Sequence, residues 1–268
     1  MAGVRIKRTS SRHHIKMKFE KLKKISEGAF GFIEKITDDN GNFFARKVLH
    51  EQRHRDNVYR LVKKRFYDEV AYMENHHHTN LTEIIEADLD VERPWYIMPM
   101  AQASVRDDLK ELKENSDLTA IALYDILSGL EFVHKSGYYH RDVCCANALR
   151  FQTDKGPRYK LSDFGVVTKI DAKGPFHKID SGHARYAPPE ITRRPMIGSE
   201  KSDIYGFGAI LHEIYGKEDR SNRKTIVNET GPFATIMQKC TQITPDDRYN
   251  NIQELFGDLA KVITPPHH

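Results

Sequence analysis

Alternating and clustered apolar residues in the first hundred positions predict short strands. Residues 30–33 and 43–48 have the apolar and aromatic character of strands. The turn-forming sequence at 38–41 lies between them and indicates a hairpin. Residues 95–98 form another short apolar run. The first part of the chain is therefore predicted to be rich in β-strand.

Longer apolar periods predict helices. Residues 62–73 carry Phe66, Val70 and Met73 at spacings of four and three, as expected of a helix with one apolar face. The other helices predicted in this way cover residues 104–114, 117–135, 201–215 and 249–262.

The order of these elements predicts an α+β protein with two lobes. The strand-rich lobe covers about residues 17–98, and the larger, mostly helical lobe covers about residues 104–263. A short connector at 99–103 joins them. Small-molecule sites are common where two such units meet, so we expect a binding site near this connector.

The composition is that of a soluble globular protein: of the 268 residues, 39% are hydrophobic and 30% are charged. The net charge of +4 does not by itself require a nucleic-acid partner. Basic residues are concentrated before residue 25, and residues 1–16 are interpreted as a basic, solvated tail. The alternative is a docking arm for an acidic partner or a membrane surface.

Three cysteines, Cys144, Cys145 and Cys240, are too few for a disulfide framework. The chain has no secretory signal and no apolar run long enough to span a bilayer, so we expect a cytoplasmic location. Residues 264–268 are interpreted as a tail. Its last two histidines are typical of a purification-tag remnant and are given no function.

One ordered set of polar motifs lies in the second half of the chain. His140, Arg141 and Asp142 are followed by Asn147, and Asp163 begins an Asp-Phe-Gly sequence. A carboxylate can orient an attacking hydroxyl, and an amide with a second carboxylate supplies the oxygen ligands that Mg²⁺ prefers. Phosphoryl transfer needs these groups. The set resembles the eukaryotic-type protein kinase family, and the chain is identified as a minimal and divergent member.

The resemblance implies a bilobal protein kinase fold over residues 17–263 and an ATP-dependent kinase that uses Mg²⁺. Asp142 would be the catalytic base, and Asn147 and Asp163 would bind the metal. Phe164 and Gly165 complete the second motif. The implied partner is a protein substrate, with autophosphorylation as a further expectation.

Residues 25–33 resemble the glycine-rich loop that covers the nucleotide phosphates in this family. Gly28 and Gly31 match two of its glycines, and Ser26 replaces the first. Met98 occupies the gatekeeper position. By the same resemblance, the adenine base of the nucleotide would be lined by Ile25, Ile33, Ala45, Met98, Pro99, Ala101 and Leu149.

Lys47 matches the strand lysine that contacts the α- and β-phosphates in the family and pairs with a glutamate of the following helix. Glu69 is the expected partner. Asp68 is the alternative, but Glu69 is favoured because Val70 and Met73 then pack on the adjoining apolar face.

Three residues resemble structural positions of the family. Glu190, in a sequence similar to Ala-Pro-Glu, would pair with Arg248, and Asp203 would brace the catalytic loop. Small-molecule phosphotransferases generally lack the pair that corresponds to Glu190 and Arg248. This pair therefore favours a platform for a peptide substrate.

The chain departs from the family pattern near the base. Cys144 replaces the lysine usual in serine/threonine kinases, Ala146 replaces the arginine usual in tyrosine kinases, and His183 replaces a threonine. Serine/threonine specificity is favoured, with atypical tyrosine or dual specificity as the alternative. A catalytically inactive, kinase-like scaffold is the other alternative.

Arg141 indicates regulation, because such an arginine can bind a phosphate on the activation loop. Thr168 and Ser181 are the candidate acceptors. Cys144 and Cys145 are interpreted as small packed residues rather than a redox pair, and residues 76–78, three histidines, as a solvated loop rather than a metal site.

Overall fold

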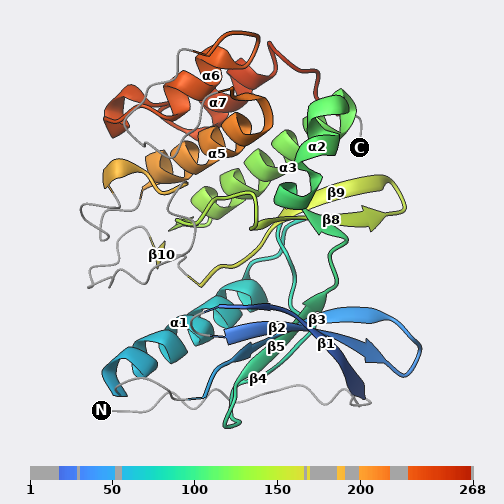
Figure 1. Ribbon diagram of the computed structural model, residues 1–268. Coiled ribbons are helices and arrows are strands. Elements are labelled where there is room, and N and C mark those ends of the chain that lie inside the picture. Colours follow the sequence, from blue (N-terminus) through green and yellow to red (C-terminus); the bar gives the residue numbers. More distant parts are fainter. Residues whose placement is uncertain are drawn as a thin grey trace.

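In the computed structural model a strand-rich part and a helical part lie on opposite sides of the molecule, as the sequence predicts (Figure 1). The structure describes residues 18–28, 31–51, 56–165, 168–169, 186–190, 199–217 and 229–266. The predicted tail at 1–16, the two terminal histidines, Ser181 and His183 lie outside the described residues.

The strand-rich part is one antiparallel sheet. Across the sheet its strands are β1 (Phe19–Glu27), β2 (Gly31–Asp38), β3 (Phe43–Leu49), β5 (Trp95–Pro99) and β4 (Glu86–Asp88). The predicted hairpin between β2 and β3 is confirmed. The Asp38 carboxylate accepts hydrogen bonds from the backbone N–H groups of Asn40 and Asn42, and Gly41 has a φ of 83°, which glycine adopts without strain.

Helix α1 (Asp56–Asn75) follows β3 and packs against the sheet. It contains the predicted helix at 62–73 and is longer at both ends. Its predicted apolar face is confirmed, because Phe66, Val70 and Met73 are buried. The Phe66 ring lies 5.4 Å from that of Tyr96 on β5, so α1 and β5 share one core.

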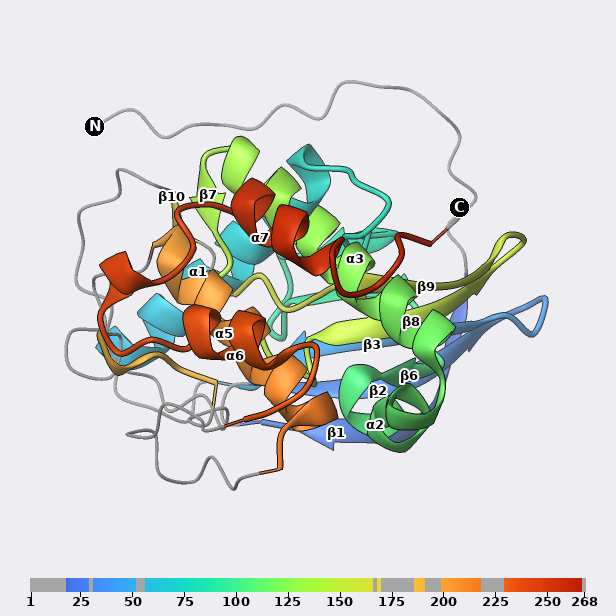
Figure 2. The ribbon, with the colours of Figure 1, turned by 90° about the horizontal axis from the view of Figure 1, so that it is seen from above.

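Helices dominate the second part. They are α2 (Val105–Glu114), α3 (Ser116–Lys135), α5 (Glu200–Tyr215), α6 (Ala234–Cys240), the 3₁₀ turn η1 (Pro245–Asp247) and α7 (Ile252–Leu259). Three agree closely with prediction. The helix predicted over 249–262 is shorter, because the Asn251 side chain accepts a hydrogen bond from the backbone N–H of Glu254 and caps α7 there. Figure 2 shows α7 beside α3 and α6 beside α5, which is buried along most of its length.

Short strands of the second part flank the motifs. They are β6 (Ala103–Ser104), β7 (Tyr138–Tyr139), β8 (Ala148–Thr153), β9 (Gly156–Leu161) and β10 (Thr168–Lys169). The His-Arg-Asp motif lies between β7 and β8, and the Asp-Phe-Gly motif follows β9. The segment after α1 joins β9, since Leu161 donates its N–H to Asn80 O and accepts from Thr82 N, both at 2.8 Å. Among the helices described here, none is long and apolar enough to cross a membrane.

Candidate active site

Lys47, Glu69 and Asp163 meet from three separate elements. Lys47 Nζ on β3 lies 2.9 and 3.0 Å from the carboxylate oxygens of Glu69 on α1. The same ammonium lies 3.0 Å from Asp163 Oδ1, after β9. Asp68, the alternative partner, is exposed and pairs with Lys64 on α1. The structure therefore brings Lys47 to Glu69 and not to Asp68, and one cation links the two parts of the protein.

These three charges shift one another's pKa. Burial alone would lower the pKa of Lys47, but the carboxylates of Asp163 and Glu69 raise it well above its ordinary value. The Lys47 ammonium lowers the pKa of Asp163. Burial raises the pKa of Glu69, and Asp163 adds to that rise against the attraction of Lys47. Lys47 is thus a cation at neutral pH.

Asp142 and Asn147 are held together within the segment between β7 and β8. Asn147 Nδ2 donates to both the carboxylate Oδ2 and the backbone carbonyl of Asp142, each at 2.9 Å. The Asn147 carbonyl accepts from Ser162 N at 2.8 Å and from Ser162 Oγ at 3.1 Å. Ser162 directly precedes Asp163, so these bonds fix the His-Arg-Asp and Asp-Phe-Gly motifs against each other.

Two residues of these motifs have a left-handed backbone. The φ angle is 68° at Arg141 and 61° at Asp163. Such a conformation is strained for a residue with a side chain, by roughly 1–2 kcal/mol, and persists where the surroundings fix it. The Arg141 N–H is held by the Asp203 carboxylate at 2.7 Å, and the Asp163 carboxylate by Lys47. The contacts of the site thus maintain the strain.

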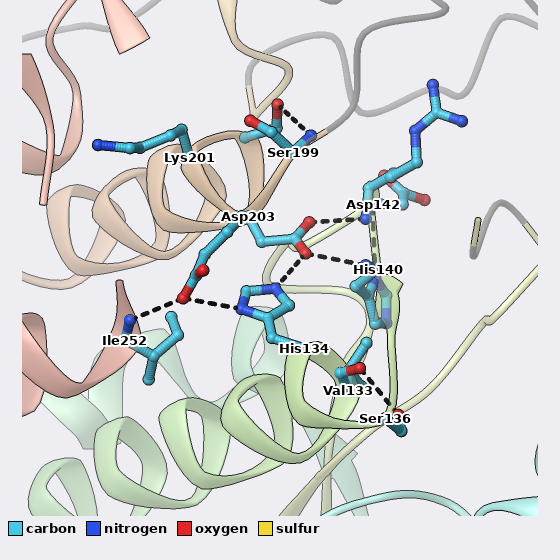
Figure 3. Close-up of polar contacts among 12 residues, drawn as sticks. Val133, His134, Ser136, His140, Asp142, Ser199, Lys201, Asp203 and Ile252 are labelled. Carbon is cyan, nitrogen blue, oxygen red and sulfur yellow. Dashed lines mark hydrogen bonds and ion pairs between the residues drawn. The ribbon is translucent and has the colours of Figure 1, made fainter. Parts of the chain in front are cut away.

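Asp203 on α5 braces the His-Arg-Asp backbone (Figure 3). Its Oδ2 accepts from His140 N at 2.8 Å, while its Oδ1 accepts from Arg141 N. Gly206, one helical turn further, allows close approach, because a Cβ there would lie 2.6 Å from the carbonyl oxygen of Val143. The structure therefore places Asp203 where the sequence resemblance expects it.

His134, at the end of α3, is a second support that the sequence analysis did not identify. Its Nε2 lies 2.8 Å from Asp203 Oδ2, and its Nδ1 lies 3.2 Å from Glu200 Oε1 (Figure 3). Burial alone would lower the pKa of His134, but the hydrogen bonds and charges of these carboxylates raise it to about 9. The imidazole is therefore a buried cation between two anions.

The glycine-rich segment has a different requirement at each glycine. A Cβ on Gly31 would lie 2.5 Å from the carbonyl oxygen of Val48, so glycine is needed there for β2 to approach β3. The expected role of Gly31 beside the nucleotide phosphates stays a prediction. Among the described residues, a Cβ at Gly28 would come within 4 Å of Gly31 O alone, at 3.8 Å, and Gly28 N donates to that oxygen at 2.8 Å. Ser26 lies in β1.

The residues expected to line a nucleotide base come from several strands and from the connector. Ala45 and Met98 are direct cross-strand partners on β3 and β5, and both are buried. Ile33 on β2 and Leu149 on β8 are partly buried. Pro99 ends β5 and Ala101 follows it in the connector, while Ile25 near the end of β1 is exposed. The set thus comes from both parts of the protein.

Glu190 and Arg248 form the expected ion pair in the helical part. Arg248 Nη1 and Nη2 lie 2.7 and 2.9 Å from the two oxygens of Glu190, a bidentate arrangement. Arg248 also donates to the carbonyls of Lys201 and Gln242, and its side chain is fully buried. The pair therefore joins the segment before α5 to the segment after η1.

Cys144 and Cys145 are fully buried. Burial raises the pKa of the Cys144 thiol, and raises that of Cys145 to about 12. Neither is a thiolate at neutral pH, which supports the packed interpretation over the redox one.

The histidines at 76–78 are only partly solvated. His76 stacks on Tyr72 and His78 on Phe132, whereas His77 is exposed. Among the described residues, no group of three or more His, Cys, Asp or Glu side chains is arranged to hold a metal ion. The expectation of a loop without a metal site therefore stands as a prediction, but two of its rings are packed.

Of the candidate phosphate acceptors, only the backbone of Thr168 is described. It lies in β10, opposite Tyr139 of β7. Ser181 lies outside the described residues. The regulatory interpretation of Arg141 thus remains a prediction.

Tyr96 is a further residue of the site that the sequence analysis did not identify. Its hydroxyl donates to Glu69 Oε1 at 2.8 Å. The two-residue alternation of β5 shows from sequence that Tyr96 shares a face with Met98. Its partner on α1 depends on how the helix packs, so sequence alone carried no signal for the bond.

Comparison with known proteins agrees with this geometry. A sequence model of the protein kinase domain matches residues 19–264. That span covers nearly the whole chain, and the chain belongs to the protein kinase family. Both the predicted family and the α+β bilobal fold are confirmed.

Curated relatives have low identity and different printed specificities. A probable serine/threonine-protein kinase of Dictyostelium discoideum is 25% identical, covering 85% of this chain and 43% of its own length. The tyrosine-protein kinase receptor svh-2 of Caenorhabditis elegans is 27% identical, over 92% of this chain and 24% of its own. A membrane-associated tyrosine- and threonine-specific cdc2-inhibitory kinase of Drosophila melanogaster is 29% identical, over 77% and 38%. The chain thus spans less than half the length of these relatives.

Proposed function

We propose that the protein is an ATP-dependent protein kinase that transfers the γ-phosphate to a protein hydroxyl, with serine or threonine favoured. The observation that carries this proposal is the convergence of Lys47, Glu69 and Asp163, joined through Ser162 to Asn147 and Asp142. A cation, a candidate base and two candidate metal ligands come from distant points of the sequence. A binding module alone would not require all of them.

Each group has a distinct proposed role. Lys47 would bind the α- and β-phosphates, with Glu69 holding its ammonium in place. Asp142 would orient the substrate hydroxyl and accept its proton, and the Asn147 amide, which bonds its carboxylate, would fix its direction. These residues act by position and charge, which is what phosphoryl transfer requires.

The donor set fits Mg²⁺ bound together with a nucleotide. Asp163 offers a carboxylate of lowered pKa, and the bonds that Asn147 makes to Asp142 use its Nδ2, so its amide oxygen would be the ligand. Mg²⁺ commonly takes one or two protein oxygens and completes its shell with phosphates and water. When bound, the ion would neutralise charge on the transferred phosphate.

The nucleotide base is proposed to lie between the lobes, against Ile33 and Ala45 above and Leu149 below, with Met98 at the gatekeeper position. Backbone groups of Pro99 and Ala101 in the connector would hydrogen-bond it. The proposal assigns residues 17–98 to the smaller lobe, 99–103 to the hinge and 104–263 to the larger lobe. We also propose the cytoplasmic location that the sequence analysis expects.

The acceptor class is the least constrained part of the proposal. Cys144 is buried and provides no cation beside Asp142, so this position favours neither class. The name of the Dictyostelium relative supports serine/threonine specificity. The names of the C. elegans and Drosophila relatives support tyrosine as the alternative.

The test is phosphate transfer from Mg²⁺-ATP to the protein itself and to generic protein substrates, with sites mapped by mass spectrometry. We expect transfer by the wild type and by Asp154→Asn, a matched change in the exposed β8–β9 turn. Asp142→Asn is expected to reduce transfer by at least about 100-fold, the usual contribution of a catalytic base. An Asp142→Asn variant as active as the wild type would remove Asp142 from the mechanism. Binding of ATP without any transfer would favour the scaffold alternative.

A further inference from the structure

The carboxylate of Glu69 is held from two sides. Lys47 contacts both of its oxygens, and the Tyr96 hydroxyl donates to Oε1 at 2.8 Å. The Tyr96 side chain is only 1% exposed, and Glu69 is 2% exposed. A buried carboxylate needs several donors, and here Lys47 and a neutral tyrosine both supply them.

The position of Tyr96 follows from strand pairing. Tyr96 on β5 is the direct cross-strand partner of Lys47 on β3, so both side chains leave the same face of the sheet. That face is covered by α1. Phe66 and Glu69 are three residues apart on α1, hence neighbours on its surface, and Tyr96 contacts both. Its ring packs near the Phe66 ring at 5.4 Å while its hydroxyl reaches the Glu69 carboxylate.

We propose that Tyr96 is a positioning residue that fastens α1 to the sheet, so that Glu69 keeps the Lys47 ammonium directed at the nucleotide phosphates. This inference rests on the proposed kinase function for its catalytic consequence. The structural part, a latch between β5 and α1, stands on the contacts alone. Lys47 and Tyr96 extend from β3 and β5, so the carboxylate is fixed by two adjacent strands instead of one flexible side chain.

The hydroxyl is what separates a latch from simple packing. A phenylalanine at position 96 would fill the same space and keep the contact with Phe66. It would lack the donor, and one oxygen of a buried carboxylate would then lose a hydrogen bond. Burial and the neighbouring Glu69 raise the pKa of Tyr96 well above its ordinary value, so the hydroxyl keeps its proton and remains a donor.

The chain offers a matched control. Tyr159 on β9 is also fully buried, and its hydroxyl donates to Asp108 Oδ2 at 2.7 Å, away from Lys47 and Glu69. Tyr159→Phe and Tyr96→Phe therefore remove the same group from the same kind of bond. Any effect found only in Tyr96→Phe belongs to the place of the bond and not to its loss in general.

The first measurement is hydrogen–deuterium exchange of the α1 amides at a temperature where all variants are folded. A hydrogen bond to a charged group is worth roughly 1.5–3 kcal/mol, so Tyr96→Phe is expected to speed exchange in α1 by about ten-fold or more. Tyr159→Phe is expected to leave α1 exchange unchanged. Equal α1 exchange in Tyr96→Phe, Tyr159→Phe and the wild type would overturn the latch.

A double-mutant comparison assigns the effect to Glu69. In a Glu69→Ala background the acceptor is absent, so adding Tyr96→Phe should not speed α1 exchange further. An undiminished effect of Tyr96→Phe in that background would show that the hydroxyl acts through another group. This arm measures folded protein and does not depend on enzymatic activity.

The second measurement is steady-state phosphate transfer, with kcat and the KM for Mg²⁺-ATP determined separately. If the Lys47 ammonium loses its orientation, kcat falls more than the affinity for Mg²⁺-ATP does. Tyr96→Phe is therefore expected to reduce kcat by about five-fold, with KM changed less than about two-fold. Tyr159→Phe should change neither constant. An unaltered kcat in Tyr96→Phe would refute the catalytic role even if α1 loosens. An inactive wild type would instead refute the proposed function and leave the exchange result to decide the latch.

Discussion

At the scale of single residues, burial decides how much a polar contact contributes. Arg248 and Glu190 form a bidentate pair with the arginine side chain fully buried. Lys64 and Asp68 form a pair on the surface of α1, with side chains 68% and 57% exposed. Water screens the charges of the exposed Lys64–Asp68 pair, whereas it cannot take the place of Glu190 beside the buried Arg248. Only the buried pair is therefore expected to affect stability.

Glu190→Ala is expected to lower the free energy of unfolding by about 3 kcal/mol, because it leaves the Arg248 cation buried without an anionic partner. Urea denaturation followed by circular dichroism would measure it. As the control, Asp68→Ala breaks the exposed pair and should change stability by less than about 0.5 kcal/mol. Equal effects of the two substitutions would contradict this account.

At the scale of elements, one buried cluster ties three helices to the His-Arg-Asp segment. His134 ends α3 and lies between Asp203 and Glu200 of α5, and Glu200 accepts from the backbone N–H of Ile252 at the start of α7. Asp203 in turn holds the backbone of His140. The helices are thus coupled to the His-Arg-Asp segment through charge as well as apolar packing.

This cluster predicts a pH dependence of stability. The pKa of His134 is raised from 6.5 to about 9 in the folded state. The folded protein therefore binds the proton more tightly than the unfolded chain. The stabilisation is complete below pH 6.5, decreases as pH rises, and is absent above about 9, with a total of about 3 kcal/mol.

Urea denaturation of the wild type and His134→Gln between pH 6 and 9.5 would test this. We expect the stability difference between the two proteins to be largest at the acid end and to shrink through that range. Subtracting one curve from the other removes the contribution of cysteines and other groups that titrate in both. Parallel curves would show that His134 is not a buried cation.

At the scale of the whole molecule, the two parts are joined at the candidate site. Lys47 of the sheet contacts Asp163 of the helical part, and the segment at Asn80 and Leu81 pairs with β9. A ligand held by residues of both parts would strengthen this junction. Nucleotide binding should therefore stabilise the entire fold, because only the folded state contains the site.

Mg²⁺-ATP at about 100 times its Kd is expected to stabilise the protein by about 2.7 kcal/mol, which raises Tm by roughly 5–10 °C. Thermal unfolding with ATP and Mg²⁺, and again after addition of EDTA, would measure the shift and its metal-dependent part. Asp163→Asn should lose the metal-dependent part. Absence of any shift in the wild type would argue against a nucleotide site.

Much of the architecture was open to prediction because it depends on local patterns. The period of Phe66, Val70 and Met73 identified α1 and its buried face, and the Asp-Asp-Asn-Gly turn identified the β2–β3 hairpin. The bounds of α7 could not be predicted, because a side-chain cap at Asn251 makes the helix shorter than its apolar pattern. Short strands such as β6 and β10 also gave too little periodicity to recognise.

For the candidate site, the sequence by itself determined which chemical groups are present and in what order, and the motifs around Lys47, Asp142 and Asp163 sufficed for the family. The resemblance favoured Glu69 over Asp68 as the partner of Lys47, and the structure has this pair. Other partners were decided only by the tertiary structure, which placed His134 between two carboxylates and brought the Tyr96 hydroxyl to Glu69. The reason is physical: residue spacing sets the face from which a side chain leaves its own strand or helix, whereas a contact between elements depends on how both pack.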